Sequence, residues 1–337
     1  MKAIAYRTAG SLDRDDALEN VELDRPKATG RDILVAVKAI SVNPVDYKIR
    51  KNVSAEDGQW KVLGWDVAGE VVEVGDDVSA FKPGDEVFYS GSLIRQGANS
   101  EFHLVDERIV GHKPKSISNA QAAALPLTAI TAWEMLFDRL DIEKPVPGAA
   151  NAVVIIGGAG GVGSIAIQLV RALTDLTVIA TASRPETQAW VKELGAHHVI
   201  DHSKPIAEQV KALGIGAPGF VFSTTETPRH TKEIIELISP QGRFGLIDDP
   251  ETFDITGFKR KALSVHWELM FTRSIYETAD MDEQGELLNE VAALIDAGRI
   301  RTTVTDVMSP INAENLKKAH ATLESGKARG KIVLEGF

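Results

Sequence analysis

The sequence contains no cysteine at any of its 337 positions. Disulfide bonds, thiolate nucleophiles and zinc sites with cysteine ligands are therefore excluded. The sequence also lacks a run of about 18 apolar residues, which a membrane-spanning helix needs. Residues 1–6 are typical of a strand and not of a signal peptide. We therefore expect a cytoplasmic protein without a membrane partner.

Positive charge is scarce relative to negative charge. The chain has 37 Lys and Arg residues against 48 Asp and Glu residues, which gives a formal net charge of −11. Nucleic-acid phosphates require clustered basic side chains, so no nucleic-acid partner is expected. The hydrophobic share of 44% and the charged share of 25% are typical of a globular protein. The length suggests about two domains.

The pattern of predicted secondary structure changes along the sequence. Residues 1–123 contain short β-rich runs, such as the alternation at Ile33, Val35 and Val37, separated by turn signals. After an Ala-rich, helix-like stretch that Pro126 interrupts, apolar strands alternate with amphipathic helices, which predicts parallel βαβ units. The predicted strands are 152–157, 177–182, 198–200, 219–224, 243–248 and 263–270, and the predicted helices are 163–174, 185–194, 204–213 and 229–238.

The predicted fold class is α/β, in three segments. A compact β domain begins with residues 1–123, and a doubly wound parallel-sheet domain occupies residues 124–262. Residues 263–337 contain a helix at 283–297 and a final helix–strand pair. They are too few for an obvious third domain, so we expect them to return and complete the first one.

Five glycines lie within residues 157–163, between a predicted strand and a predicted helix. The segment Gly158-Ala159-Gly160-Gly161-Val162-Gly163 matches the pattern G-x-G-x-x-G in its required strand–turn–helix context. Such glycines form a tight turn, let backbone N–H groups approach a pyrophosphate and allow close helix packing. A tight turn with no ligand is the alternative, but the surrounding βαβ units favour a Rossmann nucleotide site.

The residues after the second strand of this domain indicate which nucleotide binds. An NAD site places an acidic residue there for the ribose 2′-hydroxyl. This chain has Ser183 and Arg184, with no carboxylate before Glu186. A hydroxyl and a guanidinium suit a 2′-phosphate, so NADPH is predicted over NADH. Ser183 and Glu186 also match a helix capping box, which would leave Arg184 available.

Several segments together resemble one known family. They include VNPVDYKIR (42–50), LPLTAITAWE (125–134), ELGAHHVIDH (193–202) and GKIVLEG (330–336). The chain resembles the medium-chain dehydrogenase/reductase superfamily, and within it the quinone oxidoreductase-like branch of the zinc-type alcohol dehydrogenase-like proteins. The resemblance implies a GroES-like β domain, an inserted Rossmann domain and a cleft between them for the nicotinamide.

The sequence departs from the zinc-binding members of that superfamily. At the two cysteine positions it has Asn43 and Leu127, and at the histidine position it has Trp65. No metal is expected, and without a metal to stabilise an alkoxide, oxidation of simple alcohols is disfavoured. The residues His197, His198, Asp201 and His202 form a weak metal candidate. His202 stands where related reductases often carry a tyrosine near the adenosine phosphate, so a cofactor contact is favoured.

The resemblance also implies where the other site residues lie. Asn43 and Tyr47 are the polar candidates for catalysis near the nicotinamide, although Asn43 can instead bond its own turn and Tyr47 can simply pack. Asp46 is expected to be a structural turn partner. Trp65, Trp133 and Phe271 would line an apolar pocket or belong to the core. Asn43 is also an implied cofactor contact. The remaining implied cofactor contacts are Thr131, which can alternatively back-bond within its helix, Thr224, Ile247, Phe271 and Lys331.

The expected activity is reduction of quinones or other conjugated carbonyls (enones) by hydride transfer from NADPH. Such acceptors spread the incoming charge themselves, so the protein must supply mainly proximity, exclusion of water and hydrogen-bond donors. The alternative is an NADPH-binding protein with little turnover, in a crystallin-like, sensor or RNA-binding role. By analogy with the family, a homodimer is expected.

Overall fold

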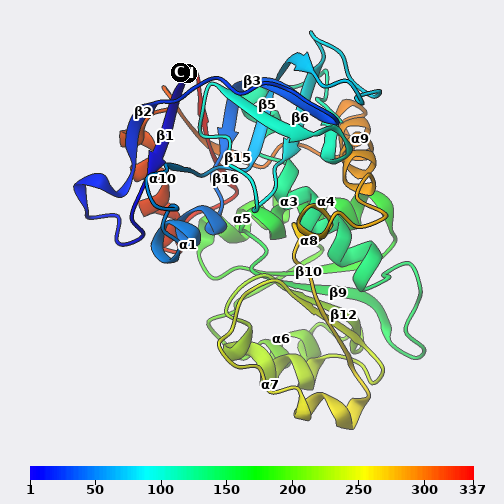
Figure 1. Cartoon of the computed structure of the whole chain (residues 1–337). Coiled ribbons are helices and arrows are strands. Elements are labelled where there is room, and N and C mark those ends of the chain that lie inside the picture. Colours follow the sequence, from blue (N-terminus) through cyan, green and yellow to red (C-terminus); the bar gives the residue numbers. More distant parts are fainter. The chain divides into compact units, whose positions relative to one another are not determined.

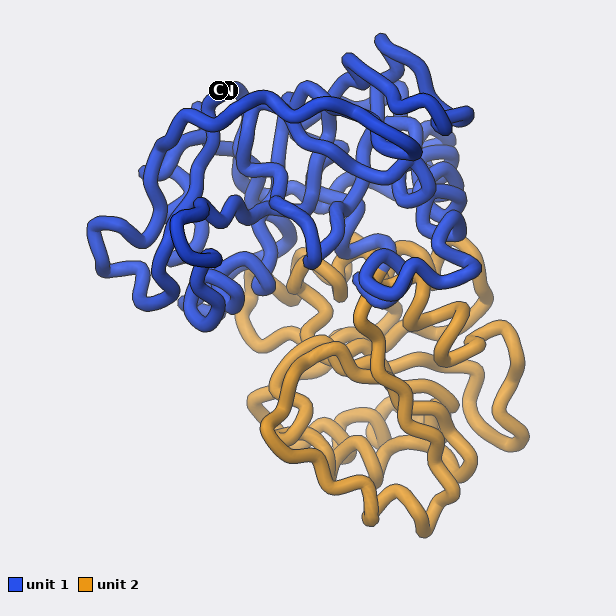
Figure 2. Tube along the Cα trace, viewed as in Figure 1, with its two compact units in different colours: residues 1–130, 271–337 blue, residues 131–270 orange.

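The computed structural model describes residues 1–337. The chain divides into two compact units (Figure 2). Unit 1 comprises Met1–Ile130 and Phe271–Phe337, and unit 2 comprises Thr131–Met270. Unit 1 is therefore built from two separate stretches of the chain, and unit 2 from one.

Unit 1 contains two sheets (Figure 1). The three-stranded sheet has the order β2-β1-β4, with β1 (Lys2–Tyr6), β2 (Glu19–Glu22) and β4 (Lys61–Val62). The seven-stranded sheet has the order β15-β16-β3-β5-β6-β8, with β7 paired to β3. Its strands are β3 (Asp32–Ser41), β5 (Asp66–Val74), β6 (Glu86–Ser90), β7 (Phe102–Asp106), β8 (Val110–His112), β15 (Val304–Met308) and β16 (Lys331–Glu335).

Strand β3 is the centre of the seven-stranded sheet. It pairs with β5, β7 and β16, so the last strand of the chain lies beside an early one. The predicted alternation of buried and exposed residues along β3 is only partly correct. Leu34 is as fully buried as its neighbours Ile33 and Val35, because both faces of the strand are covered at this point.

The helices of unit 1 surround these sheets. The predicted break at Pro126 is confirmed, because Pro126 begins a helix, where its missing N–H costs nothing. Ser118 caps the helix before it, and its hydroxyl accepts from the backbone N–H of Gln121 at 3.2 Å. The helices are α1 (Pro44–Asn52), α2 (Asn119–Ala123), α3 (Pro126–Trp133), which crosses into unit 2, α8 (Thr272–Tyr276), α9 (Glu283–Asp296) and α10 (Ala313–Glu324).

Unit 2 contains a six-stranded parallel sheet with the order β11-β10-β9-β12-β13-β14. This is the Rossmann strand order, and the strands and helices predicted from the sequence are confirmed with small shifts at their ends. The last strand is shorter than predicted. The strands are β9 (Ala150–Ile156), β10 (Thr177–Thr181), β11 (His198–Ile200), β12 (Pro218–Ser223), β13 (Arg243–Leu246) and β14 (Ser264–Trp267), and the helices are α4 (Gly161–Leu173), α5 (Pro185–Glu193), α6 (Ile206–Ala212) and α7 (Thr227–Leu237).

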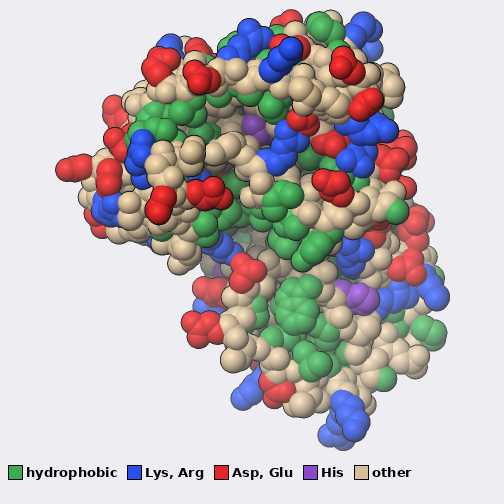
Figure 3. All heavy atoms as spheres, viewed as in Figure 1, with side chains coloured by type: hydrophobic (Ala, Val, Ile, Leu, Met, Phe, Trp, Pro, Cys, Tyr) green, Lys and Arg blue, Asp and Glu red, His purple; other side chains and the backbone are tan.

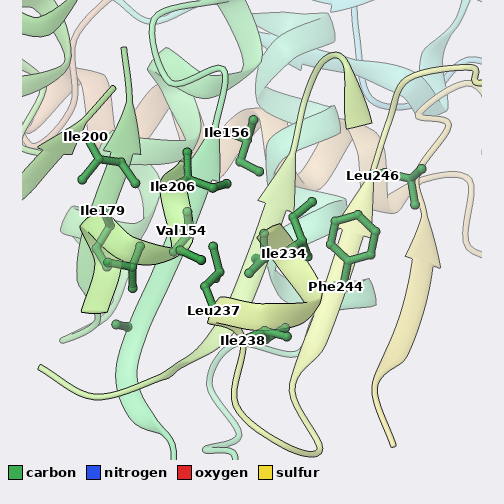
Figure 4. Packing of buried hydrophobic residues seen from close by; sticks show 14 of the residues in the cluster. Val154, Ile156, Ile179, Ile200, Ile206, Ile234, Leu237, Ile238, Phe244 and Leu246 are labelled. Atoms are coloured by element: carbon green, nitrogen blue, oxygen red, sulfur yellow. The ribbon is translucent and has the colours of Figure 1, made fainter. Parts of the chain in front are cut away.

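The core of unit 2 explains the apolar runs in its strands. Figure 4 shows strand residues such as Val154 and Phe244 packed among helix residues such as Ile206, Ile234 and Leu237, which come from α6 and α7. These five side chains are all buried. Because a parallel sheet is covered by helices on its faces, its strands need nearly continuous apolar sequence.

Candidate functional site

The predicted cofactor residues of unit 2 other than Thr131 gather at one edge of its sheet. The carboxyl ends of parallel strands lie at the same edge, and ligands of such folds bind there, where the strand order reverses. In this sheet the reversal lies between β9 and β12. The 157–163 turn, Thr224 and Ile247 directly follow β9, β12 and β13. Ser183 and His202 are the second residues after β10 and β11.

The glycines of the 157–163 turn have different roles. An added Cβ at Gly163 would lie 2.4 Å from the carbonyl oxygen of Gly157 and 2.7 Å from Cα of Gly158, so glycine is needed there for close packing. An added Cβ at Gly160 would meet only the Gly157 oxygen, at 3.4 Å. Gly160 precedes the first turn of α4, whose N–H groups and positive helix end favour a phosphate.

Thr224 joins the end of β12 to the end of β9. Its backbone N–H and its hydroxyl both donate to the carbonyl oxygen of Ile156, at 3.1 and 2.9 Å. Its hydroxyl oxygen would lie 2.3 Å from a Cβ added to Gly157, which is too close, and Gly157 has a φ of +79°. The glycine turn and Thr224 are therefore held together at the point where the strand order reverses.

Arg184, not Ser183, caps helix α5. The helix begins at Pro185, which takes the first helical position, and the hydroxyl of Thr187 reaches back to accept from the N–H of Arg184 at 3.2 Å. The predicted capping box of Ser183 and Glu186 is therefore wrong by one residue. The Nε atom of Arg184 lies 3.2 Å from a carboxylate oxygen of Glu186, and both side chains are partly exposed.

His202 follows β11 and lies beside charged residues of α7. Its ring centroid is 6.4 Å from that of His230. Burial lowers the pKa of His202 below its ordinary value, and the carboxylate of Asp201 opposes this shift. The cations Arg184 and Arg229 lie close enough to lower the pKa of His202 further.

Sequence reasoning missed Arg229. This residue lies in α7, in the first turn of the helix, and its guanidinium is 3.1 Å from a carboxylate oxygen of Glu226. Glu226 has a φ of +49°, in the left-handed region that non-glycine residues rarely adopt. The only sequence signal was that the segment follows a predicted strand of the parallel-sheet domain. The fold brings Arg229 close enough to the predicted cofactor contact His202 to lower its pKa.

Unit 1 holds the other group of predicted site residues in its interior. Lys331 Nζ lies 3.0 Å from Oδ2 of Asp66, and the two side chains are 3% and 0% exposed. Asn43 is also buried, and its Nδ2 donates to the same Asp66 oxygen at 2.8 Å. The other carboxylate oxygen of Asp66 accepts from the backbone N–H of Leu127 at 2.7 Å. We call Asn43, Asp66, Lys331 and the Leu127 N–H the lysine cluster.

Asp46 completes the first turn of α1 beside this cluster. Its carboxylate accepts from the backbone N–H of Asn43 at 2.7 Å, as its expected structural role requires. Burial raises the pKa of Asp46 to about 7, and the nearby charge of Lys331 limits the rise. Tyr47 is half-buried on the same turn, and Lys51 Nζ lies 5.2 Å from its ring centroid.

The aromatic residues named as pocket candidates are mostly packed. Trp65 is buried, donates its indole N–H to the carbonyl oxygen of Ser92 at 3.1 Å and contacts Phe271 edge to face at 6.0 Å. Trp133 packs against Phe137 with ring centroids 5.0 Å apart. Two further predicted cofactor contacts differ in exposure: Thr131 is buried, and Ile247 is half-buried.

The residues at the three zinc-ligand positions do not fit a zinc ion. Asn43 and the backbone of Leu127 bond to Asp66, and Trp65 presents an N–H that cannot ligate a metal. The structure contains no group of three or more His, Cys, Asp or Glu side chains that could hold a metal. The weaker metal candidate is the group of His197, His198, Asp201 and His202. In it, Nδ1 of His197 accepts a hydrogen bond from the backbone N–H of Val178, and Nε2 of His197 is hydrogen-bonded to Arg171.

The distribution of charge on the surface is consistent with the mixed acidic and basic composition of the sequence. On the face shown in Figure 3, basic side chains are interspersed with acidic ones. No helix is both long enough and apolar enough to cross a membrane.

Two family models match the chain. Residues 29–117 match the alcohol dehydrogenase GroES-like domain, and residues 194–334 match the zinc-binding dehydrogenase family. A zinc-type alcohol dehydrogenase-like protein of Staphylococcus aureus is 40% identical over 336 residues, which cover 99% of each chain. The mitochondrial NAD(P)H oxidoreductase RTN4IP1 of Homo sapiens is 34% identical over 336 residues, covering 90% of this chain and 81% of that one.

Solved structures show the same similarity. A Rhizobium etli protein named for zinc-dependent alcohol dehydrogenases is 66% identical, with a TM-score of 0.99 over 100% of this chain and 98% of that chain. The quinone oxidoreductase of Escherichia coli, solved with NADPH, is 25% identical, with a TM-score of 0.83 over 99% and 100% of the two chains. The chain therefore belongs to the zinc-type alcohol dehydrogenase-like proteins of the medium-chain dehydrogenase/reductase superfamily, a family of NAD(P)H-using oxidoreductases.

Proposed function

We propose that this protein is an NADPH-dependent, zinc-independent reductase of quinones or other conjugated carbonyls. The observation that supports the proposal is the edge of the unit 2 sheet, which carries the glycine turn at 157–163, the cation Arg184, and His202 with the cation Arg229 close to it. We propose that this turn binds the pyrophosphate. Guanidinium groups match the geometry and charge of a 2′-phosphate. The E. coli relative named above, a quinone oxidoreductase solved with NADPH, supports the same assignment.

The bound cofactor would supply a hydride, and the chain's own residues would bind and orient it. In the proposed arrangement the N–H groups at the start of α4 hold the pyrophosphate, and Arg184, His202 and Arg229 hold the 2′-phosphate. Thr131, Thr224, Ile247 and Phe271 remain proposed contacts. A conjugated acceptor needs no metal to polarise it, which suits a chain whose zinc-ligand positions carry Asn43, Trp65 and Leu127.

Tyr47 is the proposed proton donor. It is half-buried, whereas Asn43 is buried with its amide already engaged by Asp66 and Lys331. Asn43 is therefore better suited to hold the start of α1 than to give a hydrogen bond to a substrate. We expect Tyr47→Phe to lower kcat about tenfold with little change in cofactor affinity.

We also propose a homodimer formed through the sheet edge of unit 2. Strand β14 pairs only with β13, and its outer residue Trp267 is 52% exposed. An exposed strand edge can pair with the same edge of a second copy. Light scattering of the purified protein would test this proposal, and a monomer at all concentrations would contradict it.

The test of the function is an acceptor panel with NADPH and NADH. We expect quinones and enones to be reduced with NADPH, and simple alcohols not to be oxidised with NADP⁺. NADPH binding without turnover of any acceptor would instead favour the alternative of a binding protein with little turnover. Zinc-dependent oxidation of simple alcohols would overturn the proposal.

A further inference from the structure

The ammonium group of Lys331 has no N–H left for an outside partner. A lysine has three N–H donors and no acceptor. Lys331 donates to the carbonyl oxygen of Val42 at 2.9 Å, to Oδ2 of Asp66 at 3.0 Å and to Oδ1 of Asn43. The residue is only 3% exposed. These contacts satisfy its three donors inside unit 1.

These bonds fix one short segment, the turn between β3 and α1. Val42 and Asn43 form that turn, and both accept a bond from Lys331. Asn43 in turn passes the constraint to the helix, because its backbone N–H donates to Asp46 in the first turn of α1. Tyr47 is the next residue after Asp46. It therefore lies in the part of α1 that the bonds of the lysine cluster fix in place.

We propose that Lys331 is a positioning residue, which fixes the start of α1 through Val42 and Asn43 and thereby sets the place of Tyr47. This inference rests on the proposed function where it assigns a role to Tyr47. A direct contact between Lys331 and the cofactor is what the sequence predicts. In the present proposal Lys331 instead acts on the site indirectly, through the turn between β3 and α1.

The other end of α1 is held independently, which makes the proposal specific. Tyr6 donates from its hydroxyl to the carbonyl oxygen of Val53 at 2.7 Å, just after the helix ends. Arg50 donates to the carbonyl oxygen of Gly10 at 2.7 Å and pairs with Glu324. Loss of Lys331 should therefore loosen the first turn of α1 and leave its last turn protected.

A buried ion pair is by itself weak evidence for stability, so the experiment must separate charge from geometry. Lys331→Met leaves the buried Asp66 without its cation. The double variant Asp66→Asn with Lys331→Met removes both charges while the asparagine oxygen can still accept from Leu127. Lys113→Met is the matched control, because Lys113 is also buried in unit 1 and bonds Pro114 and Ile117, away from α1.

The first measurement is amide hydrogen exchange in residues 42–53. In Lys331→Met we expect the first turn of α1 to exchange about tenfold faster than in the wild type, with the last turn unchanged. The double variant should recover the urea midpoint that Lys331→Met loses and keep the fast exchange. In Lys113→Met both turns should exchange as in the wild type. Wild-type exchange in the first turn of both Lys331 variants would overturn the proposal.

The second measurement is kinetic, with NADPH and a quinone. We expect the double variant to show a kcat about tenfold lower and an NADPH Kd within about twofold of the wild type. A weakened NADPH Kd with wild-type kcat would show that Lys331 contacts the cofactor, and would overturn the proposal. Absence of wild-type turnover with every acceptor would refute the proposed function, whereas the exchange measurement would still decide the role of Lys331.

Discussion

Arg50 lies directly against His320 in the interior of unit 1, and its Nε donates to Nδ1 of His320 over 3.4 Å. Both side chains are almost completely buried. Burial, and then the positive charge of Arg50, lower the pKa of His320 to about 3. This histidine is therefore neutral in the folded protein over the whole physiological pH range.

The buried histidine makes stability depend on pH. The unfolded chain takes up the proton first, at its pKa near 6.5, so the contribution of His320 is complete above about pH 6.5 and is lost as pH falls towards 3. We expect the free energy of unfolding to fall in this window by up to roughly 1.4 kcal/mol per pH unit from this residue. Urea unfolding of His320→Gln at several pH values should show a shallower slope than the wild type.

A matched control is His112→Gln, because the side chain of His112 is exposed. That variant should keep the wild-type slope. A residual slope in His320→Gln is expected from His103, whose pKa burial lowers to about 4. Identical slopes in His320→Gln and the wild type would contradict the assignment.

Gly160 and Gly163 of the glycine turn should respond differently to substitution. Gly160→Val should leave unit 2 folded, because a Cβ there meets one atom at 3.4 Å, but should weaken NADPH binding at least about tenfold by crowding the phosphate. Gly163→Ala should lower the melting temperature by several degrees, since its Cβ would press on the backbone at 2.4 Å. Calorimetry and fluorescence titration measure the two effects separately. Unchanged NADPH affinity in folded Gly160→Val would mean that the turn does not bind phosphate.

The choice between NADPH and NADH should depend on two arginines. Arg184→Ala should weaken NADPH binding roughly ten- to hundredfold and barely affect NADH, because only NADPH carries the 2′-phosphate. Arg229→Ala should have a smaller effect, about three- to tenfold, since its side chain is 60% exposed and solvent screens its charge. Both differences should shrink as salt rises. Equal losses for the two nucleotides would assign the arginines to the fold.

Glu226 should oppose NADPH binding. Its carboxylate pairs with Arg229, so a 2′-phosphate would have to compete with it for the guanidinium. We expect Glu226→Gln to tighten NADPH binding a few-fold and leave NADH binding nearly unchanged. Titration of both nucleotides against this variant checks the sign, and weaker NADPH binding would contradict the prediction.

Activity should not depend on a metal ion. The zinc-ligand positions carry Asn43, Trp65 and Leu127. The side chain of Asn43 and the backbone N–H of Leu127 both donate hydrogen bonds to Asp66 in the lysine cluster. We expect exhaustive chelation to leave turnover unchanged and metal analysis to find less than one zinc per chain. Activity that disappears with a chelator and returns with zinc would refute this prediction.

The sequence by itself determined the parallel-sheet architecture of unit 2. The glycine spacing at 157–163 and the alternation of strands and helices are local patterns, and each follows from the conformations that neighbouring residues can adopt. The lack of cysteine excluded the usual zinc ligands without any structure. The start of α5 was misplaced by one residue, because Pro185 at the first helical position makes Arg184 the cap.

Only the tertiary structure decided which distant residues meet. Lys331 is 265 residues from Asp66 and 288 from Asn43 along the chain, and no local pattern pairs them. Arg229 likewise comes close enough to His202 to lower its pKa, although 27 residues separate them, because α7 begins after the carboxyl end of β12. The periodicity of a sequence shows which secondary structure one segment prefers. These clusters depend instead on strand pairing and burial, which bring charged side chains from separate segments together. Once buried, these side chains need hydrogen bonds and opposite charges from one another.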